Sequence, residues 1–358
     1  MKKYIMIRII WVFVVLFILL SLNFFMFKMA PQFPPPDEGE RDIYYTRQVT
    51  DGYMTREYTT DPEKILEWRK IAREGSRKNS RFVFTGRTSA RAYFPVPLAT
   101  QYFNWLKNVI TEWNWGVSTR VQPNTPVFEV LEQRIGVTVQ LNLLALVFYI
   151  PIGITLGIFA ALKKDSLLDN LISVGVMIMI SIPSFVVITL IMMIFGYQLG
   201  WLPTIFAARD VVTSIRLQGY IIPVVSLITV PVAGLTRLTR AELTEVLTSE
   251  FLLLARAKGL TRSQAVVRHA LRNSLVPIIP SIIFAFTGMF AGAVIIEIIY
   301  SIPGAGRLYL RALTQSAYDY NLLLALTAFY SAISFFGILF VDLAYGVVDP
   351  RIRMGARK

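Results

Sequence analysis

The sequence contains no cysteine and only one histidine, His269. Without cysteine the chain can form neither disulfides nor thiolate metal sites. One histidine is too few for a histidine-ligated metal site, and we interpret His269 as a structural or interface residue. The chain also lacks the G-x-x-x-x-G-K-[ST] loop of P-loop ATPases and the H-E-x-x-H and G-x-S-x-G patterns of common hydrolases. These absences predict that the chain is not an enzyme, has no catalytic residues and holds no metal or cofactor of its own.

Long stretches without charge recur along the chain. Hydrophobic residues are 54% of the chain, which is far above the share in a soluble protein. A helix needs about 20 apolar residues to cross a bilayer. Six runs are long enough, and we interpret all of them as transmembrane helices: residues 9–27, 135–162, 171–195, 217–236, 273–296 and 321–341.

The first run could also be a secretory signal peptide. No small-residue cleavage site follows it, because Lys28 and a group of prolines come next. We therefore expect residues 1–28 to form a retained N-terminal transmembrane helix.

Acidic residues are scarce in these runs. Glu297 and Asp342 lie near run ends, and no series of acids forms a proton relay. Carriers coupled to protons or sodium usually mark their path with buried ionisable residues. The scarcity predicts that the energy for any transport comes from a partner.

The net charge of +13 reports topology rather than nucleic-acid binding. Sixteen lysines and arginines lie at the termini, after residue 162 and between residues 237 and 272, whereas the opposite short loops hold four. Short cytoplasmic loops carry the excess of positive charge in membrane proteins. This asymmetry predicts a multi-pass membrane protein in which both termini and the loop at 237–276 are cytoplasmic.

The segment 29–134 is predicted to be a small extracytoplasmic domain of mixed α and β structure. Its charges nearly balance, because residues 28–134 carry 16 basic and 13 acidic side chains. Two Tyr- and Thr-rich stretches, 43–50 and 53–60, flank Asp51-Gly52 and predict a β-hairpin. Asp61-Pro62 predicts the start of a helix that ends at Gly75, and residues 101–113 predict another helix.

The most informative stretch is the polar one between the fourth and fifth runs. Gly259 follows one amphipathic pattern and predicts a helix end with a left-handed backbone. Thr261 and Gln264 predict a capping box that begins a second helix. The expected apolar stripes are Leu243, Val246, Leu247, Leu253 and Leu254 on the first helix, and Val266, Val267, Ala270 and Leu271 on the second, opposite Arg262, Arg268 and Arg272. A helix, a glycine turn and a second helix, basic on one side, predict an element that docks on a partner.

Within this stretch ARAKGL, from Ala255 to Leu260, and HALRNSLVP, from His269 to Pro277, resemble the cytoplasmic coupling loop of ABC importer permeases. The resemblance is to the first of the two permeases of dipeptide, oligopeptide and nickel importers. LGWLPT at 199–204, EIIYSIPGAGRL at 297–308 and DLAYGVVDPRIR at 342–353 also resemble this family. The similarity begins near Gln101, and the stretch 31–94 is longer than expected there, so we interpret it as an insertion.

The resemblance implies an all-α type I permease fold with six transmembrane helices and the extracytoplasmic domain inserted between helices 1 and 2. Residues 135–358 would be the permease domain. The implied partners are a second homologous permease, two ABC ATPase subunits, an extracytoplasmic binding protein, a peptide substrate and membrane lipid, with no nucleic acid. The implied ATPase-coupling residues are Ala255, Arg256, Ala257, Lys258, Gly259, Leu260, Arg268 and His269.

Further candidates lie in and near the spans. Pro183 interrupts the third run and predicts a bend of the kind that suits a helix lining a pathway, although a plain packing kink gives the same pattern. Together with Pro183, the candidate pathway or outer-gate residues are Glu297, Pro303, Gly304 and Gly306. Small residues four apart predict close helix packing, within the chain or against a second permease, at Gly153, Gly157, Gly288 and Gly292.

Several alternatives stay open at this level. Permeases similar to this one also import nickel chelates and oligosaccharides. A secondary carrier or channel would need no ATPase, and a membrane enzyme or sensor would use the segment 28–134 as its active part.

Overall fold

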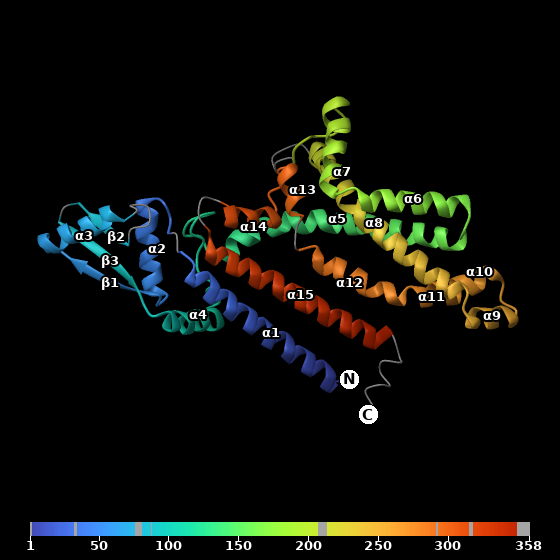
Figure 1. Ribbon diagram of the computed structural model, residues 1–358, viewed down its shortest axis with the longest axis horizontal. Coiled ribbons are helices and arrows are strands. Elements are labelled where there is room, and N and C mark those ends of the chain that lie inside the picture. Colours follow the sequence, from blue (N-terminus) through green and yellow to red (C-terminus); the bar gives the residue numbers. More distant parts are fainter. Residues whose placement is uncertain are drawn as a thin grey trace. The chain divides into compact units, whose positions relative to one another are not determined.

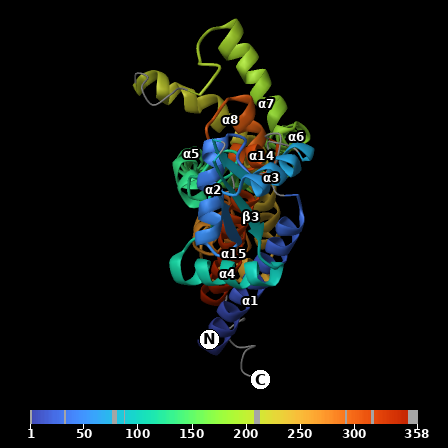
Figure 2. The same ribbon diagram turned by 90° about the vertical axis from the view of Figure 1, so that its left-hand side faces the viewer.

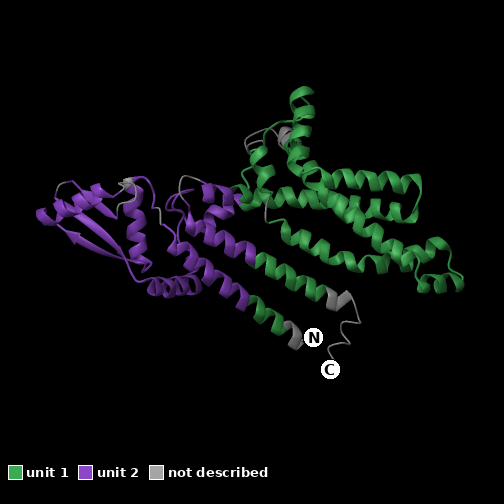
Figure 3. Cartoon of the chain, viewed as in Figure 1, with its two compact units in different colours: residues 1–13, 135–307, 332–358 green, residues 14–134, 308–331 purple. Residues whose placement is uncertain are grey.

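The computed structural model describes residues 2–31, 34–75, 81–86, 88–206, 213–290, 293–314 and 318–348. The chain forms two compact units (Figure 3). Unit 1 comprises residues 1–13, 135–307 and 332–358, and unit 2 comprises residues 14–134 and 308–331. Both units contain helices, and the described β-strands all belong to unit 2.

Five helical stretches of the described chain are long and apolar enough to cross a membrane. They are α1 (Lys2–Met29), α5 (Val127–Leu162), α8 (Thr213–Leu247), the run Arg262–Gly288, and α15 (Tyr320–Val348). A bent pair of helices would make a sixth if it is one span. The structure thus gives five or six spans, and the count of six stays a prediction.

The bent pair is α6 (Leu167–Ser181) and α7 (Ser184–Ile191), which continues as the π-helix η2 (Met192–Gln198). The two parts meet at 97° at Pro183, and both ribbon views show the change of direction (Figures 1 and 2). Ile182 has the extended backbone, φ −95° and ψ 117°, that a residue before proline prefers. The expected bend at Pro183 is confirmed, and it is a complete break in the helix.

The run Arg262–Gly288 is also irregular, and it differs from the predicted span 273–296. It contains α10 (Arg262–Ala265), the π-helical turn η3 (Val266–Ala270), α11 (Leu271–Ser274), the 3₁₀ turn η4 (Val276–Ile278) and α12 (Ile279–Gly288). A separate helix, α13 (Val294–Ile299), follows. Pro277 lies within the 3₁₀ turn, where its missing N–H prevents a regular α-helix.

The core of unit 1 lies where α5, α7, α8 and α13 meet. Its buried residues come from all four helices and from the loop after α13: Leu141, Ala145, Ile188, Ile222, Val224, Ile296, Tyr300 and Ile302. The Tyr300 hydroxyl donates to the Pro203 carbonyl, and the Phe206 N–H donates to the Tyr300 carbonyl. These bonds hold the 199–206 loop against the segment that follows α13.

Unit 2 contains a three-stranded antiparallel sheet in the order β1 (Met54–Thr59), β3 (Ser89–Pro95), β2 (Phe82–Thr85). Alternate residues of β3 point to opposite faces. Ala90 and Ala92 pack on one face against Ile65 and Trp68 of α3 (Pro62–Glu74).

On the other face of the sheet, Tyr93 stacks on Tyr45 of α2 (Glu38–Thr50), with ring centroids 5.0 Å apart. The two helices therefore cover both faces of the sheet (Figure 1). Helix α4 (Leu98–Glu112) follows β3 directly.

The predicted β-hairpin at 43–60 is wrong in its first half. Residues 43–50 belong to α2, which begins at Asp37, whose carboxylate accepts the N–H groups of residues 39 and 40. Its buried residues Arg41, Tyr44, Tyr45 and Gln48 recur at helical spacing, not in alternation. Gly52 has φ +76° and ends this helix, so Asp51-Gly52 is not a hairpin turn. By contrast, the helix predicted to begin at Asp61-Pro62 and end at Gly75 is confirmed as α3.

A buried carboxylate joins the loop at 118–121 to the start of α15 within unit 2. Asp319 accepts a hydrogen bond from the Ser118 hydroxyl at 2.6 Å and three more from the N–H groups of residues 119–121, at 3.0 to 3.2 Å. Its other oxygen accepts the N–H of Leu322 in the first turn of α15. Asp319 is fully buried, and these bonds satisfy the charge that burial would otherwise penalise.

Candidate functional site

The amphipathic stretch predicted between the fourth and fifth runs forms a helical hairpin in unit 1. Helix α9 (Glu250–Ala257) is followed by a turn at 258–260 and then by α10, η3 and α11. We call residues 250–274 the α9–α11 hairpin. It contains all eight residues predicted to couple to an ATPase: Ala255, Arg256, Ala257, Lys258, Gly259, Leu260, Arg268 and His269.

The turn has the geometry that its sequence predicts. Gly259 has φ +92°, which confirms the expected left-handed backbone. The Gly259 N–H donates to the Arg256 carbonyl at 3.0 Å and the Leu260 N–H donates to the Ala255 carbonyl at 3.4 Å, the pair of bonds that defines a Schellman motif.

The capping box after the turn is confirmed as well. The Gln264 N–H donates to the Thr261 hydroxyl oxygen at 3.3 Å, and the Thr261 N–H donates to the Gln264 side chain at 3.1 Å. Both sides of the turn are therefore fixed by hydrogen bonds.

One side of the hairpin is buried against the ends of α5 and α8. Leu252, Ala265 and Ala270 pack with Ala161 of α5 and Leu243 of α8. Leu252 was not in the predicted stripe. The prediction failed because it treated residues 243–254 as one helix, whereas α8 ends at Leu247 and Ser249 begins a new helical frame.

The opposite side of the hairpin is exposed and mixes apolar with basic side chains. Leu253, Leu254 and Val267 belong to the predicted apolar stripes and are 60%, 62% and 62% exposed. Phe251 is exposed beside them. Exposed basic and imidazole side chains on the same hairpin are Arg256, Lys258, Arg262, Arg268, His269 and Arg272. An exposed apolar patch with basic neighbours is typical of a protein interaction surface.

Two close contacts join α5 and α8, the helices against which the hairpin packs. A methyl group at Gly157 in α5 would lie 2.5 Å from the Thr239 Cβ and 2.8 Å from the Thr236 carbonyl oxygen in α8. A methyl group at Gly153 would likewise lie 2.9 Å from the Leu235 Cβ. The glycines therefore let α5 and α8 touch within the chain.

An ion pair that sequence reasoning missed ties α6 to α8. The Arg240 guanidinium donates to both oxygens of the buried Asp169 carboxylate, at 2.6 and 2.7 Å. The Asp165 N–H donates to the same carboxylate at 2.9 Å. Bidentate arginine–carboxylate pairs fix both distance and orientation. Through α5, α6 and α8, a displacement of the hairpin would reach most of unit 1.

A second site in unit 1 is built around Glu297. Its carboxylate is fully buried and accepts the Thr138 hydroxyl at 3.0 Å and the Arg307 N–H at 2.7 Å. Thr138 in turn accepts the Ala305 N–H at 2.8 Å. We call Thr138, Glu297 and residues 304–307 the Glu297 cradle.

The cradle explains two glycines of the motif EIIYSIPGAGRL. A Cβ at Gly304 would lie 2.5 Å from both oxygens of Glu297, and one at Gly306 would lie 3.0 Å from the nearer oxygen. The backbone can close around the carboxylate only because these positions lack side chains. Although Glu297 lies near the end of its run, where an acid could meet solvent, the structure buries it completely. Thr138 was missed because one hydroxyl inside an apolar run carries no pattern.

The remaining predicted residues belong neither to the α9–α11 hairpin nor to the Glu297 cradle. Pro303 lies between Ile302 and the Glu297 cradle, and Pro183 lies at the α6–α7 break. Gly288 ends α12 with no atom near the place of a Cβ. Gly292 falls outside the described residues. Within the described part of the chain, no cluster of three or more His, Asp or Glu side chains could hold a metal ion.

The comparison with known proteins decides the family. Residues 153–354, more than half of the chain, match the family described as "Binding-protein-dependent transport system inner membrane component". The chain belongs to this family. The dipeptide transport system permease protein DppB of Bacillus subtilis (strain 168) is 35% identical over 258 residues, which are 72% of this chain and 80% of that protein. The oligopeptide transport system permease protein OppB of Salmonella typhimurium is 31% identical over 353 residues, 99% of this chain and 100% of that protein.

Among solved structures, the inward-facing MetNI methionine ABC transporter matches with a TM-score of 0.45 and 16% identity, over 63% of this chain and 96% of that chain.

Membership in the binding-protein-dependent transport family fixes the broad role. The chain is a multi-pass inner-membrane permease subunit of an ABC importer, with the helical type I permease fold. Such a subunit works with another permease, with ATPase subunits that hydrolyse ATP and with a binding protein.

Proposed function

We propose that this chain is one of two permease subunits that form the translocation pathway of an importer for peptides. The peptide substrate rests on relatives whose names state dipeptide or oligopeptide transport and whose similarity extends over 72% to 99% of this chain. None of the names cited here refers to nickel or oligosaccharides, so peptides are the favoured class.

The coupling role of the α9–α11 hairpin is part of the same proposal. The observation that carries it is the exposed face of Leu253, Leu254 and Val267 beside basic side chains, on an element whose opposite face is buried in unit 1. A groove on an ATPase subunit with apolar walls and an acidic rim would cover this face. Burial of apolar surface would supply affinity, and the basic residues would supply orientation.

Transmission from the hairpin follows the contacts already described. Closure of the ATPase pair would move the hairpin, and the Asp169–Arg240 pair and the Gly157 contact would carry α5, α6 and α8 with it. At the other site, Thr138 of α5 would transfer that motion to residues 304–307 through Glu297. We assign the hairpin to the cytoplasm and the Glu297 cradle to the outer side, where Pro183 and Pro303 would border the pathway.

Segment 29–134 completes the proposal as an extracytoplasmic domain inserted between the first two spans. Its place before α5 and its near neutrality support a role at the outer mouth, in contact with the binding protein.

The test is affinity purification of the full chain in mild detergent, followed by mass spectrometry of its partners and uptake of labelled di-, tri- and pentapeptides. We expect two ATPase subunits, a second permease and a binding protein, together with peptide uptake that needs ATP. Copurification without any ATPase subunit would contradict the coupling role. Recovery of the complete assembly with uptake of a nickel chelate, and none of any peptide, would contradict the substrate alone.

A further inference from the structure

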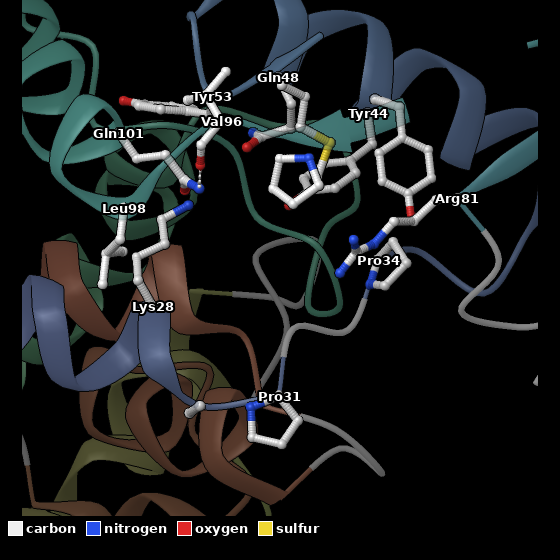
Figure 4. Close-up of a pocket in the computed structure, with 14 residues that line it drawn as sticks. Lys28, Pro31, Pro34, Tyr44, Gln48, Tyr53, Arg81, Val96, Leu98 and Gln101 are labelled. Atoms are coloured by element: carbon white, nitrogen blue, oxygen red, sulfur yellow. Dashed lines mark hydrogen bonds between the residues drawn. The ribbon is translucent and has the colours of Figure 1, made fainter. Parts of the chain in front are cut away.

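Unit 2 contains a cavity that the transport cycle proposed above does not use. Its volume is about 580 Å³, within the usual range for small-molecule sites. Its walls come from the end of α1, from α2, and from the chain around β1, β3 and α4 (Figure 4). The lining residues include two cations, Lys28 and Arg81, and no acidic side chain.

The two cations lie on opposite sides of the cavity (Figure 4). Among the described residues, neither is in an ion pair with an acid. The Lys28 ammonium lies 4.9 Å from the ring centroid of Tyr53 and 5.9 Å from that of Phe24. Arg81 is exposed to solvent at its rim. Asp51 acts electrostatically on Lys28 but does not line the cavity, so the lining itself presents two cations to an anion.

Polar groups without partners line the space between the cations. Gln48 is only 2% exposed, borders the cavity, and has no hydrogen-bond partner for its amide among the described residues. The hydroxyls of Tyr44 and Tyr45 also lack partners within the described chain. Burial raises the pKa of Tyr45 to about 12 and raises that of Tyr44 as well, so both keep their protons and can donate to an anion. The Gln48 amide faces the cavity and is available to a polar ligand there.

The membrane span fixes where this cavity lies. Lys28 is the next-to-last residue of the span Met6–Met29, so the cavity begins at the level where α1 leaves the bilayer. In the last turns of α1, Leu22, Phe25 and Met26 expose apolar surface below Lys28. That surface could hold acyl chains while the cavity holds the group above them. Cations and tyrosines at this depth are typical of headgroup contacts.

We propose that this cavity binds the phosphodiester headgroup of an anionic phospholipid. Lys28 and Arg81 pair with the phosphate, the Tyr44 and Tyr45 hydroxyls donate to it, and the Gln48 amide contacts the glycerol hydroxyls. The lipid thereby links segment 29–134 to the surface of the membrane. The site does not depend on the transported substrate or on which membrane face carries the segment.

The test uses the detergent-solubilised full chain, stripped of lipid, in native mass spectrometry. Phosphatidylglycerol and phosphatidylcholine with identical acyl chains are titrated separately. We expect phosphatidylglycerol to bind at least about tenfold more tightly, since a single lysine or arginine near a membrane surface contributes roughly a fivefold preference for anionic lipid. Equal affinity for the two lipids would overturn the proposal.

Matched variants assign the binding to the cavity. Lys28→Gln and Arg81→Gln should each weaken phosphatidylglycerol binding about fivefold, and Lys28→Arg should keep it. Lys70→Gln and Arg73→Gln remove the same charges from exposed positions on α3 outside the cavity and should change binding less than about twofold. Equal losses in the cavity and control variants would show that only the net charge matters, and would overturn the site.

A competition experiment with a soluble headgroup compound distinguishes a phospholipid ligand from a free phosphate ester. Glycerophosphoglycerol has the same headgroup without acyl chains, and we expect it to compete only at concentrations at least about a hundredfold higher, because it buries none of the apolar surface. Competition at equal concentration would refute the lipid as the natural ligand. Arg81→Gln is at an exposed position, so an unchanged thermal midpoint for this variant separates lost binding from lost folding.

Discussion

Gly259 allows the coupling proposal to be tested by a change in backbone strain alone. Its φ of +92° is a conformation that β-branched residues strongly disfavour. The place of its Cβ has no atom within 4 Å, so the Cβ of a substituted residue would meet no neighbour in the folded chain. The substitution therefore acts on the turn and not on packing.

The size of the effect follows from that strain. A residue held in a disfavoured backbone region costs about 1–3 kcal/mol. Relief of the strain would break the Schellman bonds of Gly259 and Leu260 and rotate α9 relative to α10. If the hairpin must keep its shape to dock, affinity for the ATPase subunit should fall by roughly one to two orders of magnitude.

The assay compares assembly, ATP hydrolysis and uptake in membranes. We expect Gly259→Val to insert normally and to pair with the second permease, because the buried residues of the hairpin are unchanged. Peptide uptake and substrate-stimulated ATP hydrolysis should be lost. Gly259→Asn is the control, since asparagine tolerates the left-handed region, and it should keep most of the activity. Normal uptake by Gly259→Val at normal expression would refute the coupling role of this turn.

Three further predictions test the remaining sites. Single cysteines at Glu67 and Ser263 should react oppositely with an impermeant thiol reagent added to intact spheroplasts, with labelling only at Glu67; labelling at Ser263 would contradict the proposed topology. Gly304→Ala would push a methyl group against a buried carboxylate 2.5 Å away, so we expect a loss of about 1–3 kcal/mol and a lower thermal midpoint in detergent; an unchanged midpoint would show that the Glu297 cradle is loose. Gly157→Ala should lower the midpoint similarly by separating α5 from α8, whereas the matched Gly175→Ala, with no atom near its Cβ, should not; equal midpoints for the two would argue against a close helix contact.

Local signals in the sequence predicted local structure well. Asp61-Pro62, Gly75, Gly259 and the Thr261–Gln264 pair each gave the cap or turn that the structure contains. Capping depends on residues within one turn of each other, so the sequence alone carries the necessary information.

Signals that depend on tertiary packing were less reliable. The Tyr- and Thr-rich stretch 43–50 has strand propensity, but Tyr45 stacks on Tyr93 from a helix. Packing against the sheet overrode the local preference. Likewise, the predicted stripe joined the buried Leu243 to the exposed Leu253 and Leu254, because nothing in the pattern marked the end of α8 at Leu247.

The sequence identified only some of the residues that form each site. Glu297, Gly304 and Gly306 were found through one motif, but their partner Thr138 comes from a helix 159 residues earlier. The Asp169–Arg240 pair spans 71 residues. Such pairs could be predicted only from the fold or from correlated changes among relatives.

The Asp319 contact has a consequence for the order in which the protein is made. Its partners at 118–121 are 198 to 201 residues earlier in the chain. Until the ribosome has released residue 319, three backbone N–H groups and one hydroxyl of that loop lack the carboxylate that accepts them. Unit 2 therefore cannot complete its fold while the spans α5 to α8 are being inserted, and it closes only when α15 arrives. A nascent chain stalled before residue 319 should leave the loop at 118–121 open to protease, and release of the full chain should protect it.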